Sequence, residues 1–104
     1  MENIELEIEE EKTQEGVKFV LKGRIYSENA DRLQNTLQKA LNSGQKNIIL
    51  NMHQVEFLSS AGIRVLLKTY HNANDVGGKL GIERPSQTVS NILSMLSVNN
   101  ILIE

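Results

Sequence analysis

The sequence predicts an α/β fold: a mixed β-sheet that opens with an N-terminal antiparallel hairpin, continues with parallel central strands and is covered by three to four α-helices. Three observations predict it. Two alternating apolar and polar runs open the chain, an apolar run without alternation lies near its centre, and helical patterns separate the later extended runs. Strand–helix–strand units join parallel strands through right-handed crossovers. We expect one domain over residues 1–104, because a chain of 104 residues can bury one core without disulfides.

The first two strands are predicted by a period of two. Apolar residues alternate with glutamates over 4–9, and an alternating run returns over 17–21. The polar residues 10–16 are expected to form the turn between them, and Gly23 to end the second strand. Together these runs predict the antiparallel hairpin.

The first helix is predicted between Ser27 and Gly44. Ser27 is a candidate N-cap, Glu28 places an acid in the first turn, and apolar residues follow at helical spacing. Gly44 suits the C-terminal stop. The run 47–52 comes next, and its consecutive apolar residues predict a central parallel strand with both faces covered. The helices before and after this strand are expected to supply that cover.

A second helix is predicted from Ala61 to a stop at 75–78, and a short strand follows over 79–83. The apolar stripe of this helix is expected at Ile63, Leu66, Leu67 and Tyr70.

Pro85 suits the start of a third helix, and Ser86 or Ser90 is its candidate cap. The apolar residues expected to face the core from this helix are Val89, Ile92, Leu93 and Leu96. Residues 101–103 are expected to form a final short strand or a docking tail.

Composition narrows the functional classes. The chain has no cysteine, carries a net charge of −2, and begins without the basic and apolar regions of a signal peptide. Its apolar runs are too short for a transmembrane helix. We expect a cytoplasmic protein without a membrane segment. Direct contact with nucleic acid is not expected, because the basic residues are scattered and not interleaved with aromatics.

No motif for catalysis or cofactor binding stands out. Gly77 and Gly78 are not followed by the helix of a phosphate loop, and the histidines His53 and His71 have no partners at ligand spacing. A G-x-S-x-G nucleophile elbow is absent from the sequence. We therefore expect a binding protein without enzyme activity, metal or cofactor.

Two adjacent serines, Ser59 and Ser60, mark the start of the second helix. The Ser59 hydroxyl is the expected N-cap, because it can accept a hydrogen bond from a free N–H of the first turn. One cap suffices, so the Ser60 hydroxyl is available for modification. Ala61 and Gly62 are small and are expected to let a partner approach closely. A phosphate on Ser60 would add about −1.5 to −2 charges. The helix start tolerates such a charge, so phosphorylation should switch binding rather than folding.

The run 47–67, N-I-I-L-N-M-H-Q-V-E-F-L-S-S-A-G-I-R-V-L-L, resembles the core motif of the STAS domain, the family of bacterial anti-sigma factor antagonists. The runs 19–30 and 77–82 extend the resemblance over nearly the whole chain. By this resemblance Ser60 is the phosphate acceptor. Ser59 takes the position where the family usually has Asp. Gly62 matches the family pattern.

The resemblance also implies partners. They are an anti-sigma factor that is a serine kinase with a histidine-kinase-like ATPase fold, and a metal-dependent serine phosphatase. The unphosphorylated antagonist, a monomer when free, sequesters the kinase, and the form phosphorylated on Ser60 releases it. The alternative is a STAS docking subunit of a lipid-transport ATPase or of a sensory signalling scaffold, which would use the same helix face as a permanent dock.

The partner surface is expected around the serine pair. Tyr26 stands where the family often carries Asp, and its ring either contacts a partner or covers the edge of the core. The residues expected to bind the partner are Tyr26, Ser27, Ser59, Ala61, Gly62, Arg64 and Lys68.

Overall fold

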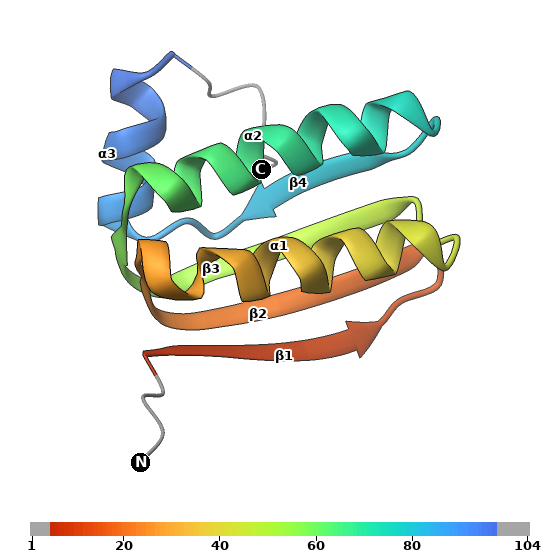
Figure 1. Cartoon of the computed structure of the whole chain (residues 1–104), viewed down its shortest axis with the longest axis horizontal. Helices are drawn as coiled ribbons and strands as arrows, with labels where there is room; N and C mark the ends of the chain where they lie inside the picture. The colour runs from red at the N-terminus through yellow and green to blue at the C-terminus, as the bar shows by residue number, and fades with distance from the viewer. Residues whose placement is uncertain (1–4, 98–104) are drawn as a thin grey trace.

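The computed structural model describes residues 5–97 and confirms the predicted fold class (Figure 1). In chain order the elements are β1 (Leu6–Lys12), β2 (Gly16–Ile25), α1 (Ser27–Asn42), β3 (Asn47–Leu58), α2 (Ser60–Asp75), β4 (Lys79–Glu83) and α3 (Gln87–Met95). The final strand expected over 101–103 lies outside the described residues. Among the described helices, none is long and apolar enough to cross a membrane.

The four strands form one sheet in the order β1-β2-β3-β4, with β1 antiparallel to β2 and the other neighbours parallel. From β2 to β4 the strand order advances steadily to one side. Right-handed crossovers therefore place α1 and α2 on the same face of the sheet. Figure 1 shows both helices in front of the sheet, where they pack against each other.

This arrangement overturns the expectation that the helices before and after β3 cover both of its faces. Ile48 and Leu50 are buried under the helices, whereas Ile49 on the opposite face is only half-buried. Lys18 and Glu83 form an ion pair of 2.9 Å on that opposite face. The open face is thus polar, and a central strand with consecutive apolar residues does not require two layers of helices.

The hairpin is longer than its alternation predicted. β1 continues to Lys12 and β2 continues to Ile25, so the turn is shorter than 10–16. Backbone pairing carries the strands through the polar residues, because an edge strand can face water on both sides. Gly23 does not end β2 as expected. It has φ +111°, and a Cβ there would lie 2.0 Å from the Glu5 carbonyl oxygen, so only glycine fits this approach.

The N-cap of α1 is Tyr26 and not Ser27, which corrects the sequence prediction. The Asn29 side chain accepts a hydrogen bond of 2.9 Å from the Tyr26 backbone N–H, and the Tyr26 carbonyl accepts one from Ala30. Asn29 therefore closes the first turn from inside the helix, and Ser27 is left as an exposed first helical residue. The stop at Gly44 is confirmed by its φ of +96°.

The buried face of α2 is rotated from the predicted stripe. Leu66 is buried as expected, but Ile63, Leu67 and Tyr70 are only half-buried. The residues that α2 buries are Gly62, Val65, Leu66, Thr69 and Ala73. Small or polar residues make up much of this face, and a pattern of large apolar residues cannot detect them.

α3 is capped by Ser86, which is one of the two caps predicted from the sequence. Its hydroxyl accepts a hydrogen bond of 3.2 Å from the Val89 N–H. Val89 and Leu93 are buried and Ile92 packs beside them, but Leu96 is 48% exposed and lies outside the predicted stripe. α3 packs against β3 and so covers a different part of the sheet from α1 and α2.

Candidate functional site

The carboxyl ends of β2 and β3 lie side by side, and each leads directly into a helix. Ile25 and Leu58 are register partners at the ends of these parallel strands. The Ser59 N–H donates a hydrogen bond of 2.9 Å to the Ile25 carbonyl oxygen. This bond brings the N-cap of α2 next to Tyr26, the N-cap of α1, so both helix starts share one edge of the sheet (Figure 1).

Ser59 caps α2, as the sequence predicted. Its hydroxyl accepts a hydrogen bond of 3.1 Å from the Gly62 N–H, and its carbonyl accepts one of 2.9 Å from the Ile63 N–H. The Ser59 side chain is half-buried. This hydroxyl is thus committed to the first turn of the helix.

Ser60 is the first residue of α2, and its side chain is exposed. Its hydroxyl makes no hydrogen bond within residues 5–97. Arg64 and Lys68 follow at intervals of four residues and are also exposed, so the three side chains line one face of the helix. The first turn of α2 contains no acidic residue. The hydroxyl therefore lies at the positive end of a helix dipole, one turn before a cation.

Gly62 does not provide clearance for a partner, which corrects the sequence interpretation. It is buried, and a Cβ built on it would lie 2.7 Å from the Ile25 Cγ2 and 2.7 Å from the Leu58 Cδ1. Its missing side chain therefore makes room for the protein's own core beneath the start of α2. Ala61 is half-buried and packs against the same core.

β3 contains two irregularities just before α2 that sequence reasoning missed. Its pairing with β2 shifts by one residue between Val20 and Lys22, and again between Gly23 and Arg24. The buried residues of this part of β3 are spaced by three, at Met52, Val55 and Leu58. Each shift adds a residue to β3, which is the pattern of a β-bulge. The apolar spacing of three was the signal in the sequence that could have revealed it.

The second shift leaves Glu56 and Phe57 both exposed. These two side chains form a cluster with Arg24 and Tyr26. The rings of Phe57 and Tyr26 pack with centroids 5.3 Å apart. Arg24 contacts Glu56 at 3.4 Å and the Tyr26 hydroxyl at 3.3 Å. Both contacts raise the pKa of Arg24, and the hydrogen bond to the Tyr26 hydroxyl contributes more than the one to Glu56. Tyr26 is half-buried and is not among the core residues of the described chain, and its ring packs on Phe57.

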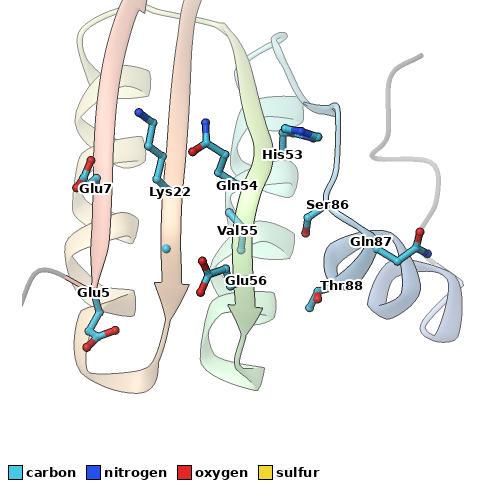
Figure 2. Close-up of a pocket in the computed structure, with 11 residues that line it drawn as sticks. Glu5, Glu7, Lys22, His53, Gln54, Val55, Glu56, Ser86, Gln87 and Thr88 are labelled. Carbon is cyan, nitrogen blue, oxygen red and sulfur yellow. The ribbon is translucent and has the colours of Figure 1, made fainter.

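A separate hollow of about 690 Å³ lies on the open face of the sheet (Figure 2). Figure 2 shows its lining side chains on β1, β2, β3 and the start of α3, with α1 and α2 behind the sheet. Lys22, His53 and three glutamates line it, but Ser60 does not. The part of the chain that the structure describes has no group of three or more carboxylate, histidine or cysteine side chains placed to hold a metal ion.

Comparison with known proteins identifies the family. The sequence profile of the STAS domain matches residues 7–103, so this chain belongs to the STAS domain family. One curated relative is BtrV of Bordetella bronchiseptica, whose name places it among the anti-sigma factor antagonists. It is 32% identical over 60 residues, which are 58% of this chain and 52% of BtrV. The chain thus matches about half the length of this relative.

Solved structures show the same fold. The anti-sigma factor antagonist SpoIIAA in its unphosphorylated form superposes with a TM-score of 0.81 at 21% identity, over 94% of this chain and 85% of SpoIIAA. The phosphorylated form of SpoIIAA from Bacillus gives 0.76 at 20% identity, over 94% and 88%. An anti-sigma factor antagonist from Mycobacterium paratuberculosis gives 0.83 at 15% identity, over 93% and 82%. The fold of this chain is therefore that of anti-sigma factor antagonists.

Proposed function

We propose that this protein is an anti-sigma factor antagonist whose binding to its partner is switched by phosphorylation of Ser60. The observation that carries the proposal is that the two serine hydroxyls differ in hydrogen bonding and exposure. The Ser59 hydroxyl is used as a cap, whereas the neighbouring Ser60 hydroxyl is exposed and has no hydrogen bond within the described chain. Ser60 is therefore the hydroxyl that a kinase can reach without breaking the helix start.

The product of such a reaction suits this position. A phosphoserine carries about −1.5 to −2 charges at pH 7. At the first position of α2 that charge meets the free N–H groups of the first turn and has no acid beside it. Arg64 stands one turn further along the same face. The folded state therefore accommodates the phosphate. The phosphate then alters the binding of a partner at this surface rather than the folding of the protein.

The docking surface that we propose surrounds Ser60. Arg64 and Lys68 extend it along the exposed face of α2, and Tyr26 and Ser27 extend it onto the start of α1. Ala61 lies beside Ser60, and Ser59 fixes the helix start through its cap. A phosphate would change both the charge and the volume at the centre of this surface. A partner packed on the free hydroxyl would be displaced.

The partners that we propose are those implied by the resemblance to anti-sigma factor antagonists. The unphosphorylated protein sequesters an anti-sigma factor that is itself a serine kinase with a histidine-kinase-like ATPase fold, and the phosphorylated protein releases it. A metal-dependent serine phosphatase restores the binding form. The relatives named as antagonists, and a SpoIIAA structure in a phosphorylated form, support this assignment. The protein acts by binding and performs no reaction of its own.

The test is phosphorylation by the cognate kinase. Purified protein is incubated with each anti-sigma serine kinase of the source organism and ATP, and the sites are mapped by mass spectrometry. The expected result is one phosphate on Ser60, lost in Ser60→Ala and kept in Ser59→Ala. Phosphate on Ser59, or on Ser60→Ala at an unchanged rate, would reject the proposal. Equal binding of wild type and Ser60→Asp would instead favour a permanent dock.

A further inference from the structure

Four side chains at the carboxyl ends of β2 and β3 form a connected group that the serine switch by itself does not explain. We name this group the aromatic corner, and its members are Arg24, Tyr26, Glu56 and Phe57. Arg24 and Phe57 are register partners on neighbouring strands. Each member touches the next: Phe57 packs on Tyr26, the Tyr26 hydroxyl accepts from Arg24, and Arg24 pairs with Glu56.

The backbone is bent to present this group. Strict alternation after the buried Val55 would turn Phe57 inward and Leu58 outward. The register shift between Gly23 and Arg24 instead leaves Phe57 43% exposed and returns Leu58 to the core. β-Bulges re-aim side chains in this way and are over-represented beside functional sites. The fold thus directs Phe57 outward where an alternating strand would have buried it.

The position of Phe57 links it to the switch. The large apolar side chains exposed among residues 5–97 are Phe57, Val76, Met95 and Leu96. Phe57 differs from the others because it stands on the strand that leads into α2, three residues before Ser60. Its contact with Tyr26, the N-cap of α1, places it between the two helix starts.

The group has the chemistry of a binding hot spot. Aromatic residues and arginine dominate the energy of protein interfaces when they are held in place before binding. Tyr26 and Phe57 are held by each other, and the charges of Arg24 and Glu56 cancel. The two rings offer apolar contact area to a side chain of a folded partner, and the paired charges of Arg24 and Glu56 give no net attraction for phosphate groups or other anions.

We infer that the aromatic corner is the specificity-determining anchor for the partner that Ser60 controls, and that this partner packs an apolar side chain against Phe57 and Tyr26. The inference rests on the proposed function and deepens it. The corner selects and holds the partner, and Ser60 decides when it is released. Arg24, Glu56 and Phe57 were not among the partner-binding residues expected from the sequence.

The experiment measures the affinity of the purified kinase that phosphorylates Ser60 for variants of the unphosphorylated protein. Phe57→Ala is expected to raise the dissociation constant tenfold or more, and Phe57→Leu to raise it less. Val76→Ala is the matched control, because Val76 is 47% exposed and follows the far end of α2. It should change the dissociation constant less than twofold. Melting curves of each variant confirm that the fold is kept.

Salt gives a second readout. The loss caused by Phe57→Ala should be the same ratio at low and high salt, because apolar contacts are not screened. The loss caused by Arg64→Ala should shrink as salt rises. Suppose that phosphorylation releases the wild type from the kinase, but Phe57→Ala changes the dissociation constant less than twofold. The inference about the aromatic corner is then overturned, and the Ser60 switch stands. If no kinase that binds the wild type modifies Ser60, the proposed function fails and the inference fails with it.

Discussion

The starts of α1 and α2 are alike in position and opposite in charge. Both helices have 16 residues, both follow a parallel strand, and both begin with an exposed serine, Ser27 in α1 and Ser60 in α2. Ser27 is followed by Glu28 and, one turn on, by Asp31. Ser60 is followed by no acid in the first turn and, one turn on, by Arg64.

This difference teaches why one serine suits a phosphate and the other does not. Both hydroxyls stand at the positive end of a helix dipole. In α1 the acid beside Ser27 already complements that dipole, so a phosphate would meet like charge. In α2 the complement is missing, and a phosphate on Ser60 would supply it. The two helix starts are therefore natural controls for each other.

The largest expected effect is on partner binding. Ser60→Asp places a carboxylate at the centre of the proposed surface, where a packed partner must remove it from water. We expect the dissociation constant for the kinase to rise about 100-fold, which is about 2.7 kcal/mol. Titration calorimetry with the purified kinase measures it. Asn74→Asp adds the same charge about 21 Å along α2 and should leave the dissociation constant within twofold. Similar losses in both variants would show a general charge effect.

The next largest expected effect is on stability and concerns Gly62, the third residue of α2, whose counterpart in α1 is Asn29. Gly62 in α2 faces the core, so Gly62→Ala is overpacked at a cost of about 1–3 kcal/mol. The better helix propensity of alanine offsets about 1 kcal/mol of that. Urea unfolding should show a net loss of about 0–2 kcal/mol, and the loss should shrink in a Leu58→Ala background. A gain in stability would mean that the glycine is kept for clearance outside the protein.

The two serines of the pair are separated by their stability effects. Ser59→Ala removes the cap of α2 and should cost about 1 kcal/mol. Ser60→Ala should change the free energy of unfolding by less than about 0.5 kcal/mol, since its hydroxyl is exposed and makes no hydrogen bond in the described chain. Urea titrations of both variants provide the comparison. A cost at Ser60 equal to that at Ser59 would make Ser60 structural.

The smallest expected effect compares charge at the two helix starts. Ser60→Asp should stabilise the fold by about 0.3–1 kcal/mol at low salt through the dipole of α2 and Arg64. Ser27→Asp should gain less or lose stability, because Glu28 and Asp31 repel the new carboxylate. Thermal melting at low and high salt measures both changes, and salt should bring the two variants together. Equal gains at low salt would show that the neighbouring charges do not matter.

The fold could be predicted from the sequence wherever periodicity and local chemistry agreed. The strand expected over 4–9, the stop at Gly44 and the cap at Ser59 each depend on neighbours within a few residues, and the structure confirms the stop, the cap and the part of the strand that it describes. The covering of β3 could not be predicted in this way. It depends on the order of strands in the sheet, which places α1 and α2 on one face.

The candidate site was predictable only in part for the same reason. Ser60 could be singled out because the residue preferences of a helix start can be recognised in the sequence. Gly62 was misinterpreted because Ile25, which comes from the neighbouring strand β2, lies beneath it together with Leu58. The exposure of Phe57 depends on a register shift against β2, which alternation along β3 alone does not show. Contacts between distant segments decided each of these cases.

Phosphorylation of Ser60 is tested as the switch by comparing the binding of the protein with and without its phosphate to one kinase. Wild-type protein is phosphorylated to completion, its modification at Ser60 is confirmed by mass spectrometry, and both forms are titrated against the same purified kinase. We expect the unmodified form to bind, and the phosphorylated form to bind at least 100-fold more weakly while it melts at the same or a higher temperature. Equal affinities of the two forms, or loss of folding on phosphorylation, would contradict it.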